Sequence, residues 1–272
     1  MNVAAPSRDV PLRIVPLGMF DARRPQRMVE RSLYVHRRSW MVIVSGFFEP
    51  LFYLLSIRVG FGALIGDITV DGRTIGYAEF VAPALMAAAA MNGAIYDSTM
   101  NVFYKLKVSK LYDSVLATPM STADVALGEI AWAMLRGLLY SVAFLLTMWA
   151  LGMTASPWIV LAIPACVLLG FAFAAVGMAV TSYMRSWADF EYVPAVQVPL
   201  FLFSATFFPL EQYGSWSWIV QLSPLYHGVA LVRAANLGEW SWGLLGHVAF
   251  LLVLAAIGLA VTARRLRTML LT

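Results

Sequence analysis

Residues 157–183 read PWIVLAIPACVLLGFAFAAVGMAVTSY and contain no charged side chain. An α-helix needs about 20 apolar residues to cross the roughly 30 Å hydrocarbon core of a bilayer, and this stretch exceeds that length. The whole chain shares its character, since 61% of its 272 residues are hydrophobic and 12% are charged. Soluble domains are about 45–50% apolar and about 25% charged. The sequence therefore predicts an all-α integral membrane protein, and it excludes a soluble two-domain fold and an intrinsically disordered chain.

Other apolar stretches bring the expected number of membrane-spanning helices to six. In chain order the expected spans are residues 41–63, 78–100, 124–150, 157–183, 190–208 and 243–263. Fifteen of the 19 Lys and Arg residues fall on one side of these spans. Because cytoplasmic segments are enriched in Lys and Arg, we expect both termini in the cytoplasm, which requires an even number of crossings. This asymmetry also explains the pI near 9.3, so we expect membrane lipids and no nucleic acid as partners.

The segments outside the spans divide the chain into four expected regions. These are a flexible cytoplasmic tail (1–25), an amphipathic interfacial helix (26–40), the six-span domain (41–263) and a C-terminal cytoplasmic tail (264–272). No apolar core of 7–15 residues precedes residue 40, so no cleavable signal peptide is expected.

The interfacial helix is predicted from its two faces. At about 100° per residue, one side gathers Val29, Leu33, His36 and Trp40, and the other side gathers Arg27, Arg31 and Arg38. Such a helix can lie flat on a membrane with its cations in water. It is either a plain anchor for the first span or a docking element for a cytoplasmic partner.

The loop over residues 101–123 mixes leucine and valine with three lysines, which suits a short amphipathic helix. Thr118 and Pro119 are expected to end that helix, because the residue before proline avoids α geometry. Ser121 and Asp124 then form a candidate capping box that opens the third span. Partner docking is the favoured interpretation of this loop, and an inert surface helix is the alternative.

Residues 209–242, on the opposite side, are unusually rich in tryptophan and tyrosine. Amphipathic aromatic side chains are enriched at headgroup level. We expect two short helices that dip into the outer leaflet and are broken near Ser223 and Pro224. The simpler alternative is an aromatic belt.

Ionisable residues inside the spans need an explanation, since each costs about 2.5–3.5 kcal/mol at the bilayer centre. Glu49, Glu129 and Arg136 lie at such depths, and similar depth suggests a Glu49–Arg136 pair between helices. Asp97 lies near a span end, where we expect it to be exposed. Structural ion pairs and roles in substrate handling or coupling both remain open for these groups.

Several kinds of chemistry lack their motifs in this sequence. It contains no G-x-x-x-x-G-K-[ST] phosphate loop, no G-x-S-x-G turn and no H-E-x-x-H pair. The three histidines are far apart in sequence and are expected at different depths, which argues against a metal site. Cys166 is the single cysteine, so no internal disulfide can form. Energy for any transport must therefore come from elsewhere.

Several separated motifs resemble the ABC type-2 export permease family. Residues 114–120 (SVLATPM) with 126–129 (ALGE) resemble its cytoplasmic-loop signature. Three further motifs resemble the branch of nodulation-factor and daunorubicin-resistance-type exporters. They are residues 49–55 (EPLFYLL), 208–211 (FPLE) and 223–233 (SPLYHGVALVR).

The resemblance implies a six-span membrane subunit that dimerises and binds two separate ATPase subunits. ATP and Mg²⁺ would sit on those partners, with no cofactor on this chain. The implied coupling helix lies around residues 105–117, between spans 2 and 3, with these coupling positions: Lys105, Leu106, Lys110, Leu111, Tyr112, Leu116, Thr118 and Pro119. The implied intramembrane and substrate-path residues are Glu49, Glu129, Arg136, Phe201 and Phe208. An extracellular re-entrant pair of helices would contain Glu211, Trp216, Pro224, Tyr226, His227 and Arg233.

The function implied is export of an amphipathic molecule, such as a lipid, a glycolipid or lipo-oligosaccharide, or a hydrophobic drug. The chain itself would be a transporter subunit and not an enzyme, located in a bacterial cytoplasmic membrane. Its partner in the membrane would be a second copy or a sister permease. An integral-membrane transferase or a channel that works without an ATPase is the rival hypothesis.

Overall fold

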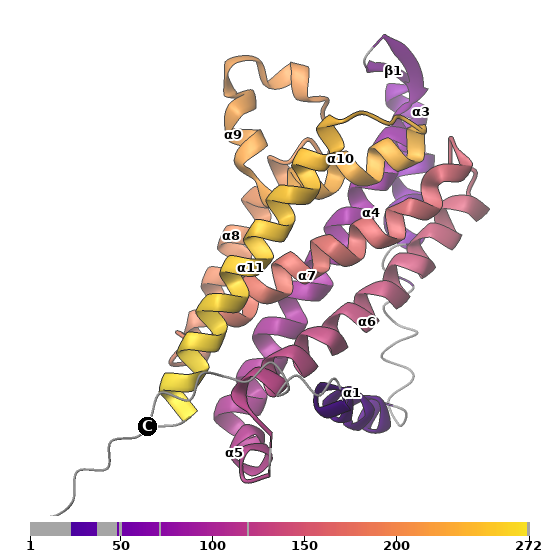
Figure 1. The fold of residues 1–272 in the computed structure, drawn as a ribbon. Helices are drawn as coiled ribbons and strands as arrows, with labels where there is room; N and C mark the ends of the chain where they lie inside the picture. The colour runs from indigo at the N-terminus through magenta and orange to yellow at the C-terminus, as the bar shows by residue number, and fades with distance from the viewer. Residues whose placement is uncertain (1–22, 37–47, 49–50, 71, 119, 271–272) are drawn as a thin grey trace, which may run out of the picture.

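The structure is a computed structural model that describes residues 23–36, 48, 51–70, 72–118 and 120–270. Its centre is a bundle of long helices that run side by side (Figure 1). These are α4 (Tyr77–Tyr96), α6 (Thr122–Ala150), α7 (Ala162–Thr181) and α11 (Gly243–Leu270). The helices α1 (Arg23–His36) and α5 (Leu111–Leu116) lie with the end of α11 at one end of the bundle, here called the α5 end. The opposite end is called the hairpin end.

Four of the described helices are long and apolar enough to cross a membrane. They are Tyr77–Val108, Thr122–Ala150, Pro157–Thr181 and Gly243–Arg265. Much of the expected first span lies outside the described residues, which show there an apolar helix over Leu51–Phe61 that ends in the π-helical segment η3 (Ile57–Phe61). The expected fifth span is the short helix α8 (Tyr192–Leu202), which follows the 3-10 segment η7 (Trp187–Glu191). The described chain is mostly helical, as expected, and four of the six expected spans meet the criterion of length and composition.

Helix α4 continues beyond its last α-helical residue through two wide turns. These are the π-helical segments η4 (Asp97–Asn101) and η5 (Tyr104–Val108). Lys110 then adopts a left-handed conformation with φ 48°, and α5 begins at the next residue. The expected amphipathic helix over residues 105–117 is therefore split, with its first part forming the end of the α4 rod. Short π-helical segments inside longer helices often occur at functional sites.

The joint between α5 and α6 is short and hydrogen-bonded. The Thr118 hydroxyl donates to the Val115 carbonyl at the end of α5. At the start of α6 the Asp124 backbone N–H donates to the Ser121 hydroxyl oxygen, and the Ser121 backbone N–H donates to the Asp124 carboxylate. This confirms the predicted capping box, which satisfies donors at the helix start that would otherwise have no partner.

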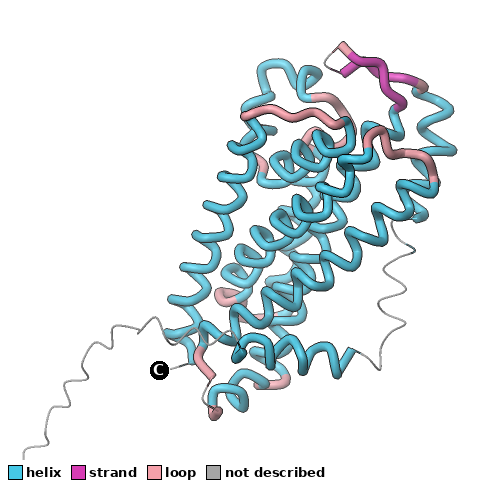
Figure 2. The backbone as a smooth tube through the Cα atoms, turned by 45° about the vertical axis from the view of Figure 1, so that its right-hand side comes forward, coloured by secondary structure: helices cyan, strands magenta, loops and turns pink. Residues whose placement is uncertain are grey.

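A two-stranded hairpin at the other end of the bundle was not expected from the sequence. Strands β1 (Asp67–Val70) and β2 (Arg73–Gly76) pair antiparallel, with Ile68 opposite Ile75 (Figures 1 and 2). Asp71 and Gly72 stand between the strands in sequence, and Gly72 has φ +76°. An Asp-Gly pair between alternating strand residues is a strong hairpin signal, but the predicted spans left residues 64–77 without an assigned secondary structure.

Small residues bring the helices of the bundle close together, as expected for membrane helices. A Cβ atom built on Gly258 of α11 would lie 2.7 Å from the Ala175 carbonyl carbon of α7. One built on Gly177 of α7 would overlap the Ser98 hydroxyl oxygen of η4. Only glycine permits these two approaches, so α7 is in close contact with α11 and with the η4 part of the α4 rod.

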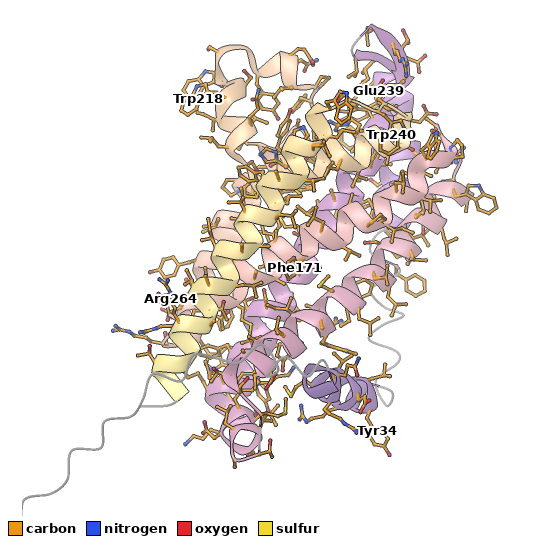
Figure 3. All side chains as sticks on the ribbon, viewed as in Figure 1. Tyr34, Phe171, Trp218, Glu239, Trp240 and Arg264 are labelled. Carbon is orange, nitrogen blue, oxygen red and sulfur yellow. The ribbon has the colours of Figure 1, made fainter. Side chains whose placement is uncertain are left out.

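Helix α1 packs against the bundle through a face that differs from the predicted one. Met28 and Ser32 are buried, and α1 contacts α6. Leu33, which was expected on the apolar face, is 57% exposed, and Tyr34 projects away from the bundle (Figure 3). Arg27 and Arg31 are exposed as expected, while Arg38 and Trp40 lie outside the described residues.

The aromatic segment before α11 folds into short helices broken where the sequence predicts. They are η8 (Leu210–Trp216), α9 (Ser217–Leu222) and α10 (Pro224–Leu237), and Ser223 is the residue that separates α9 from α10. Leu225, Val229 and Val232 of α10 are fully buried against the bundle. Trp218 and Trp240 lie exposed at the hairpin end (Figure 3).

Candidate functional site

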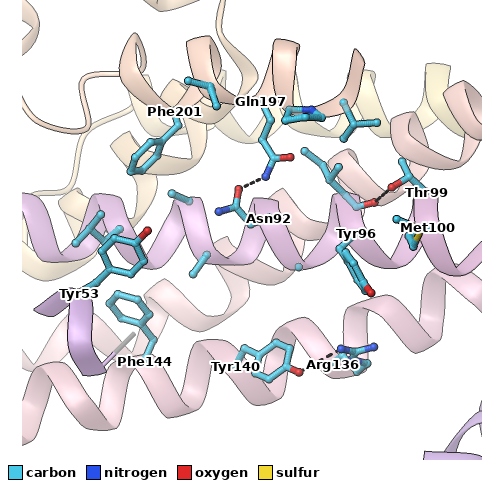
Figure 4. Close-up of a pocket in the computed structure, with 18 of the residues that line it drawn as sticks. Tyr53, Asn92, Tyr96, Thr99, Met100, Arg136, Tyr140, Phe144, Gln197 and Phe201 are labelled. Atoms are coloured by element: carbon cyan, nitrogen blue, oxygen red, sulfur yellow. Dashed lines mark hydrogen bonds between the residues drawn. The ribbon is translucent and has the colours of Figure 1, made fainter. Parts of the chain in front are cut away.

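A cavity of about 610 Å³ lies between α4, α6, α8 and the helix Leu51–Phe61 (Figure 4). Its wall is mainly apolar and aromatic. The rings come from Tyr53, Tyr96, Tyr140, Phe144, Phe190 and Phe201. Ligand sites of this size commonly combine such a wall with a small number of polar groups.

Two of those polar groups form an amide bridge across the cavity. The Gln197 side chain of α8 donates a hydrogen bond to the Asn92 carbonyl oxygen of α4, with 2.5 Å between nitrogen and oxygen (Figure 4). This bond leaves the Asn92 amino group and the Gln197 carbonyl oxygen as a donor and an acceptor on the cavity wall. The bridge also ties α8, which has no buried residue of its own, to the bundle.

A buried ion pair lies beside the same cavity. Arg136 of α6 lines the cavity, and its Nη1 lies 2.7 Å from Oδ1 of Asp97 in η4, with side-chain exposures of 13% and 4%. The Asn101 amide donates to the same Asp97 oxygen, and a second N–H of Arg136 donates to the Tyr140 hydroxyl. The expectation that Asp97 is exposed at a span end was therefore wrong. Arg136 pairs with Asp97 on the adjacent helix. The expected pair with Glu49 stays a prediction, because Glu49 lies outside the described residues.

A second buried ion pair lies nearer the α5 end. Lys105 Nζ of η5 is 2.6 Å from Glu129 Oε2 of α6, with side-chain exposures of 15% and 4%. Burial raises the pKa of the neighbouring Tyr112 hydroxyl well above its ordinary value, and the negative charge of Glu129 adds to the effect. The positive charge of Arg31 in α1 acts on the same hydroxyl in the opposite direction. Tyr112 is fully buried, so this cluster joins α1, α5, the α4 rod and α6.

The two ion pairs share one arrangement with reversed polarity. Each wide π turn of the α4 rod carries one member, Asp97 in η4 and Lys105 in η5. Helix α6 supplies the opposite charges, Arg136 and Glu129. A shift of one helix along the other would bring like charges together or leave them unpaired, so the pairs fix the register between α4 and α6.

The expected coupling positions separate into inward-facing and outward-facing groups. Leu106 and Tyr112 are buried, Lys105 is held by Glu129, and Leu111 and Leu116 are half-buried against the core. Lys110 and Thr118 are exposed, and Pro119 lies outside the described residues. The outer face of α5 also exposes Asp113, Ser114 and Ala117. A partner protein at this end would therefore meet polar and small side chains, with the leucines anchoring α5 from behind.

The residues expected in the re-entrant pair occupy several environments at the hairpin end. Arg233 lies over the Phe80 ring at 3.9 Å and donates to the Ala205 carbonyl at 2.8 Å. The Nδ1 atoms of His227 and His247 are 2.7 Å apart, so the expectation that these histidines lie at different depths was wrong. Tyr226 contacts both imidazoles and Pro224 begins α10, whereas Glu211 and Trp216 are exposed.

Of the expected substrate-path residues, the cavity includes Phe201 and Arg136. Phe208 is 53% exposed and lies outside the wall, and Glu129 belongs to the pair nearer α5. Asn92 and Gln197 were not predicted, because the cost of burial points first to charged side chains. Both are uncharged amides within apolar stretches, and that is the sequence signal by which they can be recognised.

Comparison of the sequence with known proteins identifies a matching family and several relatives. The family model described as ABC-2 type transporter matches residues 26–237. Nodulation protein J of Sinorhizobium fredii (strain NBRC 101917 / NGR234) is 30% identical over 231 residues, covering 81% of this chain and 87% of that protein. Nodulation protein J of Rhizobium leguminosarum bv. trifolii is 30% identical over 225 residues, covering 82% and 84%. The inner membrane transport permease YadH of Escherichia coli (strain K12) is 22% identical over 209 residues, covering 75% and 80%.

Proposed function

Because the chain belongs to the ABC-2 type transporter family, we propose that it is the membrane-spanning subunit of an ATP-binding cassette exporter. It moves an amphipathic substrate outward with energy from ATP that is hydrolysed on a separate subunit. The chain contains no phosphate-loop motif, so ATP and Mg²⁺ are assigned to that partner.

The α5 end carries this proposal. Helix α5 presents an exposed face of small and polar residues, while its other face is anchored by Tyr112 and the Lys105–Glu129 pair. The hydrogen-bonded joint at Ser121 connects it directly to α6. A helix held in this way suits a docking site for an ATPase, because a displacement of α5 is transmitted to a span that borders the cavity.

The cavity supports the amphipathic nature of the substrate. Its aromatic wall accommodates an acyl chain or another apolar body, and its amide bridge provides hydrogen bonds for a polar part. Lipids, glycolipids or lipo-oligosaccharides, and hydrophobic drugs all fit this description. The resemblance of residues 49–55, 208–211 and 223–233 to nodulation-factor exporters favours glycolipids or lipo-oligosaccharides.

We further propose six crossings, with both termini in the cytoplasm of a bacterial cell and the chain in the cytoplasmic membrane. Helix α1 and the end of α11 lie at the same end of the bundle, which supports an even number of crossings (Figure 1). The segment ending at η3 supplies one crossing beyond the four long helices. Segments η7 and α8 together supply the other, with a combined length of about 26 Å. The helix Leu51–Phe61 and α8, which border the cavity, would face a second copy or a sister permease.

The test is co-purification with the ATPase encoded nearest to this gene, followed by ATP hydrolysis measurements in lipid nanodiscs. We expect the permease to bind that ATPase and to change its hydrolysis rate. Ser114→Arg, on the exposed face of α5, is expected to weaken ATPase binding at least tenfold. Thr69→Arg, at an exposed position on β1 at the other end, is the matched control and should bind as the wild type does.

Two results would contradict the proposal. One is the absence of any effect on ATP hydrolysis by a folded permease that remains monodisperse in nanodiscs. The other is solute flux through proteoliposomes that contain the permease alone, which would favour the channel hypothesis.

A further inference from the structure

In the part of the chain that the structure describes, a buried carboxylate balances the cation in the wall of the cavity. Among the described residues that line it, Arg136 is the only one with a formal charge at neutral pH. That charge is matched by the Asp97 carboxylate 2.7 Å behind it, and Asp97 itself is buried and does not line the cavity. A ligand that enters therefore meets hydroxyl and amide dipoles and a guanidinium that already has its counter-ion.

This arrangement discriminates between headgroups by their charge. An anionic headgroup would lose its hydration on entry and would then compete with Asp97 for Arg136, with two negative charges close together. An uncharged headgroup with hydroxyl or amide groups needs hydrogen bonds only. The Asn92 amino group and the Gln197 carbonyl oxygen lie on opposite helices, and beside their mutual bond they offer a headgroup one donor and one acceptor (Figure 4).

We infer that the cavity binds an amphiphile with an uncharged, hydroxyl- or amide-bearing headgroup, and that Asp97 determines the selection against anionic headgroups. This inference rests on the proposed function, since it specifies the class of substrate that the exporter accepts. Asp97 acts through Arg136, so it is a positioning residue, whereas Asn92 and Gln197 touch the ligand.

The experiment uses two photoreactive probes with the same diazirine-bearing dodecyl chain, one with a glucosyl head and one with a phosphate head. Each is added to the full-length protein in phosphatidylcholine nanodiscs, and labelled peptides are mapped by mass spectrometry. We expect the glucosyl probe to label peptides from α4 and α8, and to bind at least tenfold more tightly than the phosphate probe.

Asp97→Asn frees the Arg136 charge and is expected to raise affinity for the phosphate probe at least tenfold, with little change for the glucosyl probe. In the double variant Asp97→Asn with Arg136→Gln, that gain should disappear, because the wall is neutral again. A folded Asp97→Asn protein with unchanged headgroup preference overturns the role of Asp97.

Gln197→Leu keeps both buried charges, so it tests the headgroup site even where Asp97→Asn does not fold. It is expected to weaken binding of the glucosyl probe about tenfold, while Val196→Leu, an exposed position on α8 outside the cavity wall, should leave binding unchanged. Unchanged glucosyl affinity in Gln197→Leu, or a wild type that prefers phosphate, overturns the inference. Binding is measured without an ATPase, so loss of ATP-dependent export with retained headgroup selection would count against the proposed function alone.

Discussion

At the scale of single residues, two of the buried carboxylates each meet a cation from the adjacent helix, whereas the buried Asp124 caps its own helix through Ser121. Asp97 meets Arg136, and Glu129 meets Lys105. The sequence indicated that deep charges need partners, but it could not identify them. Pairing depends on the rotation of α4 relative to α6, and the two π turns alter that rotation by amounts that no local pattern of residues reveals.

The first prediction concerns the energy of the Asp97–Arg136 pair. Arg136→Gln leaves Asp97 buried without its counter-ion and is expected to lower the free energy of unfolding by about 3–5 kcal/mol. Adding Asp97→Asn should recover a large part of that loss. The measurement is equilibrium unfolding in mixed micelles for both single variants and the double variant.

The control for these variants is the exposed ion pair formed by Arg27 and Glu30, whose side chains are 76% and 62% exposed. Arg27→Gln should change stability little, because solvent-exposed ion pairs contribute little. Equal effects of the buried and exposed substitutions would contradict the argument from burial.

The second prediction concerns Tyr112 and alkaline pH. The raised pKa of Tyr112 means that the folded protein retains the hydroxyl proton at pH values where the unfolded chain loses it. The associated stability is therefore present below about pH 10, the ordinary tyrosine value, and is lost as pH rises above it. We expect the melting temperature of Tyr112→Phe to fall less steeply than that of wild type between about pH 9.5 and 11.

The exposed neighbour Tyr104 supplies the comparison for that experiment. Tyr104→Phe should keep the wild-type slope throughout the same pH range. Parallel curves for wild type and Tyr112→Phe would show that the buried hydroxyl has no such role.

At the scale of elements, the predictions that were confirmed depended on local chemistry. The capping box at Ser121 and the break at Ser223 and Pro224 follow from hydrogen bonding and ring geometry within a few residues. The hairpin was also signalled locally, by Asp71 and Gly72, and was overlooked. The face that α1 buries could not be predicted, because it depends on a contact with α6, about 100 residues away in sequence.

The third prediction tests the close contact between α7 and α11. Gly258→Ala places a methyl group 2.7 Å from the backbone of Ala175, where no side-chain rotation can relieve the clash. We expect the free energy of unfolding to fall by about 1–3 kcal/mol as the helices separate. Thermal unfolding of the purified protein in a single detergent provides the measurement.

Gly246→Ala on the same helix is the matched control, since a Cβ atom added there has nothing within 4 Å. It should leave stability unchanged or raise it by up to about 1 kcal/mol through helix propensity. A loss of similar size in both variants would indicate a general intolerance of α11 to substitution.

At the scale of the whole molecule, composition and the distribution of Lys and Arg predicted a helical membrane protein with both termini on the same side of the membrane. The four long helices bear out the class, and α1 lies at the same end as α5 and the end of α11. The cavity could not be predicted, because its wall combines residues that are more than 100 positions apart, such as Asn92 and Gln197.

The fourth prediction concerns topology. Cys166 is 1% exposed, so the native protein should resist labelling by a membrane-impermeant maleimide. Ser114→Cys and Thr69→Cys place exposed thiols at opposite ends of the bundle. In spheroplasts, only Thr69→Cys should react with the maleimide. In inside-out vesicles, Ser114→Cys should react. Labelling of both from the same side would contradict six crossings with cytoplasmic termini.

Helix α6 has 29 residues, a capped start and no proline or π turn along its length. It is therefore a stiff rod of about 43 Å, and its first turn is joined to α5 without slack. A tilt of about 5° at that joint would displace the far end by roughly 4 Å, with Arg136 carried along partway. A small displacement of α5 at one membrane surface would therefore change the shape of the cavity deep in the bilayer, while the hydrogen bonds of α6 stay intact.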